Sequence, residues 1–139
     1  MTVRTSTRFR RERAAVPSAR AFVRHALRSE GAHSEIVDRL VLAVAEACNN
    51  AILHASGSTF TVSVVVEPAR ALVAVADEGA GFLPPDEPVM PSPHATGRRG
   101  LAMMSALVDN VDVTSGDGGT TVVLVQSLEP AATPVAAER

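Results

Sequence analysis

Apolar residues recur along this chain with two periods, about 3.6 and two residues, which are the repeats of a helix and of a strand. Spacings of three and four predict helices over residues 17–31, 34–55 and 100–108. The first of these segments opens at a proline and stops at a glycine, and the second has a serine placed to cap it. The pattern therefore predicts three helices.

Strict alternation of apolar and polar residues predicts strands in the remaining periodic segments. TFTVSVVVE, residues 59–67, and ALVAVAD, residues 71–77, are separated by a short turn and form a hairpin. VDVTS, residues 111–115, and TTVVLVQSL, residues 120–128, flank a GDGG turn and form a second hairpin. Residues 5–11 also alternate and are interpreted as an edge strand, although their arginines leave an organelle transit peptide as an alternative.

Strands paired as hairpins, with helices between them, predict a mostly antiparallel sheet with its helices on one face, an α+β two-layer sandwich. One domain over residues 1–128 accounts for all the periodic segments. Residues 129–139 have no core-forming pattern and are expected to be a disordered tail. Residues 78–99 have no periodicity, carry five of the nine prolines, and are expected to form a long loop.

Composition removes several classes of function. The net charge of -2, with no Trp or Tyr, gives neither a basic field nor stacking platforms for nucleic acid, so no direct nucleic-acid partner is expected. The single cysteine, Cys48, cannot form an internal disulfide, which indicates a reduced, cytoplasmic protein. No apolar run approaches the ~18 residues that a membrane helix needs.

Lysine is absent from the chain, because all 13 basic residues are arginines. P-loop nucleotide sites and eukaryotic-type protein kinase sites each use a particular lysine to hold phosphates. Any phosphate chemistry here must therefore use arginine, backbone amides or a metal ion.

The segment EACNNAILHA places polar side chains inside an otherwise apolar helix. Glu46 and Asn50 are four residues apart and share one helix face, with Asn49 one step around it. An amide oxygen is a hard ligand suited to Mg²⁺, and a carboxylate one turn away could act as a general base. An ordinary solvated helix face is the alternative interpretation.

Two further polar clusters follow along the chain. In DEGAGF, Asp77 ends a strand and could accept a hydrogen bond from an exocyclic amine, while Gly79 and Gly81 let the backbone approach a ligand closely. In TGRRGL, residues 96–101, a helix N-terminus and two arginines could attract phosphate. Each cluster alone could be an ordinary turn, but their occurrence together in this order favours a shared site.

These segments resemble a known family. EACNNAILHA resembles the N box of the histidine-kinase-like ATPase superfamily, DEGAGF and GRRGLAMM resemble its two glycine boxes, and GGTTVVL resembles its closing strand. The compact form is most similar to the anti-sigma-factor serine/threonine kinases of bacterial partner-switching systems. The resemblance covers about residues 9–128 and implies binding of ATP and Mg²⁺.

The resemblance also implies roles for single residues. Glu46 would be the general base and Asn50 the Mg²⁺ ligand, while Asp77 would bind the adenine amino group. Arg98 and Arg99 stand where related proteins often have a further glycine, so their part in phosphate binding departs from the family pattern. The nucleotide contacts that the resemblance implies are Asn49, Asn50, Asp77, Gly79, Gly81, Gly97, Arg98, Arg99, Gly100, Leu101 and Thr120.

By resemblance, the protein would sequester a sigma factor and phosphorylate a small antagonist protein on serine or threonine. The resemblance also suggests a homodimer. The alternative is a nucleotide-gated binding protein that transfers no phosphate. An ATPase fragment of a sensor kinase is disfavoured, because no acceptor-histidine helix precedes the domain. Arg20, Arg24 and Arg28 form one helical stripe that could meet an acidic partner, and His54 and His94 are interpreted as structural.

Overall fold

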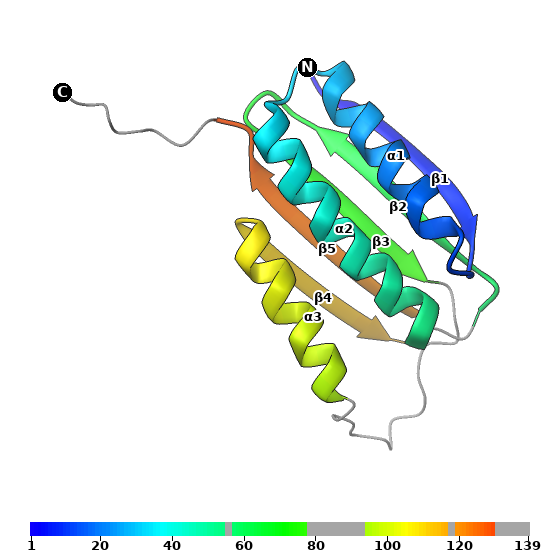
Figure 1. Ribbon diagram of the computed structural model, residues 1–139. Coiled ribbons are helices and arrows are strands. Elements are labelled where there is room, and N and C mark those ends of the chain that lie inside the picture. The colour runs from blue at the N-terminus through cyan, green and yellow to red at the C-terminus, as the bar shows by residue number, and fades with distance from the viewer. Residues whose placement is uncertain (55–56, 78–93, 117–118, 130–139) are drawn as a thin grey trace.

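The computed structural model describes residues 1–54, 57–77, 94–116 and 119–129, and for residues 94–99 it describes the backbone alone. Helices and strands follow one another along the chain as shown in Figure 1. The elements are β1 (Val3–Arg10), α1 (Ala15–Ser29), α2 (Ser34–His54), β2 (Thr59–Val66), β3 (Arg70–Asp77), α3 (His94–Leu107), β4 (Asn110–Gly116) and β5 (Gly119–Ser127).

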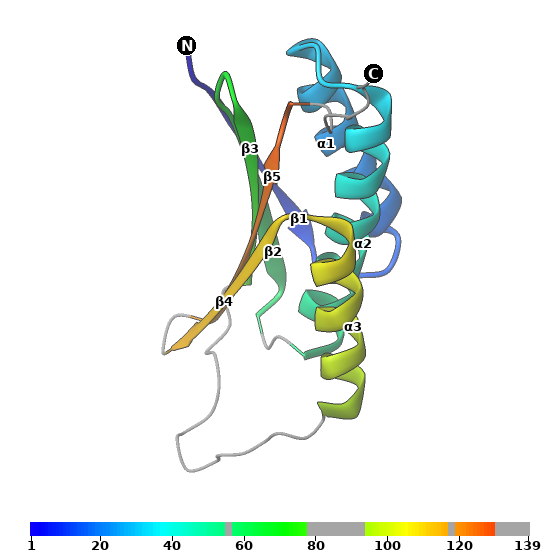
Figure 2. The ribbon, with the colours of Figure 1, turned by 90° about the vertical axis from the view of Figure 1, so that its left-hand side faces the viewer.

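The strands form one antiparallel sheet in the order β1-β2-β3-β5-β4. All three described helices lie against the same face of this sheet, so the molecule has a helix layer and a sheet layer (Figure 2). The predicted α+β two-layer sandwich is confirmed, as are both hairpins and the edge position of the first strand. α3 lies on the side of α2 opposite α1.

The core lies between the two layers and follows directly from the periodicities. Every second residue of β2, from Phe60 to Val66, is buried against the helices. α2 is the central helix and buries the apolar stripe from Ile36 to Ala51, while α1 contributes Val23 and Leu27. α2 contacts both other helices as well as β3 and β5, so it positions whatever lies at its ends.

Two helix starts differ from the sequence prediction. α3 begins at His94 and not at Gly100, so six residues assigned to the long loop are helical. The sequence pattern places Gly97 in a turn, yet one glycine inside a helix costs only about 1 kcal/mol, and the two arginines after it are good helix formers. α1 begins at Ala15, which places Pro17 in the first turn, where its missing N–H has no intrahelical partner to lose.

The β1–α1 turn is tied to the end of α2 by one side chain. The Arg11 guanidinium donates from Nη1 to the carbonyl of Ile52 and from Nε to the carbonyl of Gly57, both at 2.6 Å. The Arg11 backbone N–H also donates to the carbonyl of Ser58 at 2.9 Å. Since helix C-termini leave carbonyls without intrahelical donors, this arginine satisfies a group that would otherwise need water.

Part of the predicted loop, residues 78–93, and most of the predicted tail, residues 130–139, lie outside the described residues. The tail and the domain limits therefore stay predictions. No helix in the described part of the chain is long and apolar enough to cross a bilayer.

Candidate functional site

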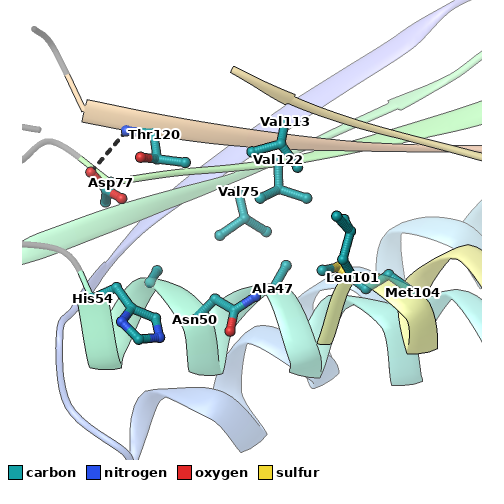
Figure 3. A pocket seen from close by; sticks show the side chains of 11 residues that line it. Ala47, Asn50, His54, Val75, Asp77, Leu101, Met104, Val113, Thr120 and Val122 are labelled. Carbon is teal, nitrogen blue, oxygen red and sulfur yellow. Dashed lines mark hydrogen bonds between the residues drawn. The ribbon is translucent and has the colours of Figure 1, made fainter. Parts of the chain in front are cut away.

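A pocket of about 260 Å³ lies between the helix layer and the sheet, near the end of β3 and the start of β5. α2 and α3 form one side of it, and β3, β4 and β5 form the other (Figure 3). The residues that line it are Ala47, Asn50, Ala51, His54, Val75, Asp77, Leu101, Met104, Val113, Thr120 and Val122.

The helix side of the pocket is one face of α2. Ala47, Asn50, Ala51 and His54 are separated by three or four residues and therefore line up along the helix. Both alanines are nearly or fully buried, yet their methyl groups are too short to reach the sheet. This face leaves room for a pocket because it carries alanine, whereas the first half of the buried stripe, from Ile36 to Val44, is mostly valine, leucine and isoleucine.

The floor and one wall of the pocket are apolar. Val75 and Val122 pair across β3 and β5, and Val113 pairs with Val122 across β4 and β5. Met104 closes the inner end and is 1% exposed, whereas Leu101, one turn earlier on α3, is 40% exposed at the rim. The pocket is therefore a slot between the two layers, and it is suited to a flat apolar group.

The opposite end of the pocket is polar and is built around Asp77. The backbone N–H of Thr120 donates to Oδ1 of Asp77 at 3.1 Å, which fixes the carboxylate at the edge of the slot (Figure 3). The Thr120 hydroxyl is hydrogen-bonded to that of Ser115 at 3.0 Å. A carboxylate has about four acceptor positions, so Asp77 can accept a hydrogen bond from a ligand as well.

Gly119 makes this approach of β5 to Asp77 possible. Its φ is +117°, which side chains other than glycine rarely allow, and a Cβ placed there would lie 2.6 Å from Oδ1 of Asp77 and would also collide with the Asp77 carbonyl. Position 119 therefore requires glycine for two reasons: the backbone angle and the lack of space for a side chain.

Glu46 and Asn50 meet α3 at Gly100. A Cβ on Gly100 would lie 3.3 Å from Nδ2 of Asn50 and 3.4 Å from Oε1 of Glu46, so the glycine lets the two helices approach where these side chains project. Asn50 also lines the pocket, whereas Glu46 lies beyond its boundary, and both are partly buried. The predicted acid and amide are therefore adjacent to each other and to the second glycine-rich segment.

Among the described residues, no group of three or more His, Cys, Asp or Glu side chains could hold a metal ion. The Asn50 amide oxygen and the Glu46 carboxylate are nevertheless hard oxygen donors at the pocket edge. Mg²⁺ commonly uses one or two protein ligands and takes the others from substrate phosphates and water. The donor set fits Mg²⁺ that arrives with a phosphorylated ligand.

The other residues that were predicted to contact the nucleotide do not all line the pocket. Asn49 is exposed and faces away from the pocket, in a shallow groove with Arg13, Val16 and Leu53. Residues 97–100 lie within the first two turns of α3, and Leu101 and Thr120 line the pocket. The Gly79–Gly81 segment lies outside the described residues.

Some pocket residues were not recognised in the sequence. The sequence pattern predicts a structural role for His54, which lines the pocket one turn beyond Asn50. The apolar floor was also missed as part of a site, since nothing in an alternating strand separates a valine that lines a pocket from one in the core. A useful signal was present in the spacing of Ala47, Asn50 and Ala51 on a single face.

Cys48 has no role in the pocket. It is fully buried, and burial raises the pKa of its thiol to about 12 because the charged form would lose its hydration. The thiolate is the nucleophilic form, so this cysteine is a packing residue, as expected from its position on the apolar stripe.

Residues 9–126 match the histidine kinase-like ATPase domain, and the chain belongs to this family. The predicted family is therefore confirmed. Among curated relatives, the anti-sigma F factor of Clostridium acetobutylicum is 32% identical over 99 residues, which cover 65% of this chain and 69% of that protein.

Solved structures agree with the fold. The RsbU and RsbW domains of a Mycobacterium tuberculosis protein superpose with a TM-score of 0.71 and 24% identity, covering 93% of this chain. This chain spans about a third (34%) of that longer one. The histidine kinase domain of a blue-light activated histidine kinase from Erythrobacter litoralis gives a TM-score of 0.54 at 22% identity, covering 83% of this chain and 60% of that one.

Proposed function

We propose that the protein is a cytoplasmic, ATP-dependent serine/threonine kinase that also acts as an anti-sigma factor in a partner-switching system. In this role it sequesters a sigma factor and phosphorylates a small antagonist protein. The family and the similarity to an anti-sigma F factor support the general class. The proposal of ATP binding and phosphate transfer is supported by the geometry of the pocket.

The observation that carries the proposal is the position of Asp77. It lies at the polar end of an otherwise apolar slot, where the Thr120 N–H holds one carboxylate oxygen. A purine with an exocyclic amine at C6, such as adenine, satisfies both ends of such a slot, because its ring contacts the valines and its amine donates to the carboxylate. Guanine would present a carbonyl oxygen at the equivalent ring position and would be repelled by the carboxylate.

The phosphates would then extend from the slot toward Asn50 and the first turns of α3. Asn50 would supply the protein's ligand to Mg²⁺, and the bound cation would neutralise phosphate charge. Glu46 lies one helical turn before Asn50 and would accept the proton of the attacking serine or threonine hydroxyl. Gly100 allows both side chains to lie against α3.

Exposed arginines on α1 would contribute to binding a sigma factor or its antagonist. Arg20 and Arg28 are exposed, whereas Arg24 donates to Asp38 of α2 at 2.8 Å. The Asp38 contact leaves two arginines of the predicted stripe to meet an acidic partner. Charge reversal at Arg20 and Arg28 should lower partner affinity at low salt, and an unchanged affinity would remove this part of the proposal.

A nucleotide-gated binding protein without phosphotransfer is the second candidate. The observation in its favour is that Glu46 lies outside the lining of the pocket, so a nucleotide could bind without engaging it. The two candidates share the nucleotide site and differ only in the role of Glu46.

Calorimetric titration with ATP, ADP and GTP tests the nucleotide site. Wild type should bind ATP in preference to GTP, and Asp77→Asn should lose at least about tenfold in ATP affinity, because a hydrogen bond to a charged group is worth about 1.5–3 kcal/mol. Asp112→Asn is the matched control, since this aspartate is exposed on β4 outside the pocket lining. Equal affinities for all three proteins would contradict the proposed site.

Partner capture tests the chemistry. The tagged protein is incubated in a lysate of the source cells with Mg²⁺ and γ-labelled ATP, and wild type is compared with Glu46→Gln. A small bound protein that gains phosphoserine or phosphothreonine only with wild type establishes the kinase. Nucleotide-dependent capture without labelling in either case supports the binding protein without phosphotransfer.

A further inference from the structure

Two hydroxyl side chains meet at the polar end of the pocket, on the strands β4 and β5. Ser115 of β4 and Thr120 of β5 are direct cross-strand partners, and their hydroxyl oxygens are 3.0 Å apart. Thr120 lines the pocket, whereas Ser115 is exposed and lies outside the pocket lining. The contact therefore joins a residue of the site to a residue that does not itself line the pocket.

Both side chains lie on the face of the sheet that packs against the helices. Val113 and Val122 are cross-strand partners that line the pocket. Ser115 is two residues beyond Val113, and Thr120 is two residues before Val122. Because side chains two apart on a strand point to the same face, the hydroxyl pair extends this row of the pocket floor toward its polar end.

Thr120 is held at two of its atoms. Its backbone N–H donates to Oδ1 of Asp77 at 3.1 Å, and its hydroxyl is hydrogen-bonded to Ser115. Figure 3 shows the Thr120 hydroxyl and the Asp77 carboxylate at the same end of the pocket. Rotation about χ1 would exchange the hydroxyl of Thr120 for its methyl group, so the bond to Ser115 stabilises the rotamer that the structure shows.

We infer that Ser115 is a positioning residue for nucleotide binding, because it donates to the Thr120 hydroxyl and so leaves the Thr120 proton for the base. The inference rests on the proposed function, in which Asp77 accepts a hydrogen bond from the amine at C6 of adenine. The neighbouring ring atom of adenine, N1, is an acceptor and needs a donor beside Asp77. Thr120 lines the pocket next to this carboxylate, so its hydroxyl can be that donor.

The number of protons determines the direction of the bond between the two hydroxyls. A hydroxyl has one proton to donate and two positions at which it can accept. If Thr120 donated its proton to Ser115, it would present only lone pairs to the acceptor on the base. When Ser115 donates instead, Thr120 can donate to N1, and two hydrogen bonds in one chain polarise each other. Ser115 thus acts on the nucleotide only through Thr120.

Calorimetric titration of the full chain with ATP and with 1-deaza-ATP, in which a C–H group replaces N1, tests this role. Wild type should bind ATP about 2- to 10-fold more tightly than 1-deaza-ATP, the range expected for one neutral hydrogen bond. Ser115→Ala should lower the affinity for ATP by a similar factor, because Thr120 loses its donor and its preferred rotamer. The affinity of Ser115→Ala for 1-deaza-ATP should stay close to that of wild type.

Two further variants separate this positioning role from a general effect on the strands. Ser115→Thr keeps a hydroxyl at the same position and should restore the preference for ATP over 1-deaza-ATP. Thr114→Ala is the control, since Thr114 is exposed on the same strand and its side chain points to the opposite face of the sheet. It should leave both affinities unchanged, and circular dichroism verifies that every variant is folded.

A Ser115→Ala protein that binds ATP as tightly as wild type would overturn the inference. A loss of affinity that is equal for ATP and 1-deaza-ATP would also overturn it, because Ser115 would then only support the pairing of β4 with β5. Equal binding of the two nucleotides by wild type would refute the role of Thr120 as a donor and leave the proposed nucleotide site standing. Failure of wild type to bind ATP at all would contradict the proposed function itself, and the inference with it.

Discussion

Replacement of Gly100 by alanine should separate stability from function. Alanine is favoured over glycine inside a helix by about 1 kcal/mol, which raises the melting temperature of a domain of this size by about 4 °C. The new Cβ would lie 3.3 Å from Asn50 and 3.4 Å from Glu46, so these flexible side chains must move by a few tenths of an ångström. Because a displacement of about 1 Å can cost roughly 100-fold in rate, a decrease of about 3- to 10-fold in phosphate transfer is expected.

The assay combines thermal unfolding with turnover of γ-labelled ATP in the presence of the captured partner. Ser105→Ala is the matched control, because it lies exposed on the same helix and gains helix propensity without approaching the site. The expected result is an unchanged or higher melting temperature for both variants and a loss of turnover for Gly100→Ala alone. Full activity in Gly100→Ala would refute the argument that Glu46 and Asn50 act from their positions against α3.

Three other changes have outcomes that the structure defines. Gly119→Ala should lower the free energy of unfolding by about 1–3 kcal/mol and weaken nucleotide binding, because φ is +117° and the Cβ would collide with Asp77; an alanine protein as stable as wild type by urea titration would contradict this. Cys48 should resist thiol reagents at pH 8 in the folded protein. Since the unfolded thiol, with a pKa near 9.0, loses its proton before the folded one at about 12, stability should fall as pH rises between these values, and Cys48→Ala should remove that slope. Arg11→Met should cost about 1–3 kcal/mol by leaving two backbone carbonyls without their donor, and an unchanged urea midpoint would show that water replaces the guanidinium.

Most of the fold could be predicted because its signals are local. The alternation in residues 59–77 shows which side chains face the helices. It also defines the strand register, because a shift of one residue would turn the apolar side chains to the other face of the sheet. The start of α3 was not predictable in the same way. Its first turns carry no apolar stripe, so only weak helix propensity indicated that the helix begins at His94.

Some residues of the candidate site could also be predicted from the sequence, and others could not. Glu46, Asn50 and Asp77 could be found in the sequence because they are polar in segments that are otherwise apolar, and the structure places each at or beside the pocket. The contact between Gly119 and Asp77 could not be found, since it depends on how β3 and β5 pair across more than forty residues of chain. Asn49, one residue from Asn50, faces away from the pocket because a single step along a helix turns a side chain by about 100°.

The alanine face of α2 has a consequence for how long the protein survives. A pocket of about 260 Å³ that Ala47 and Ala51 leave open deprives the surrounding side chains of contacts that a filled core would give them. Any ligand that occupies it adds RT ln(1 + [L]/Kd) to the free energy of unfolding, about 2.7 kcal/mol when the ligand is at 100 times its Kd. Proteases that cleave the unfolded chain would then remove the empty form faster than the filled one. The abundance of the protein would thereby follow the supply of its ligand.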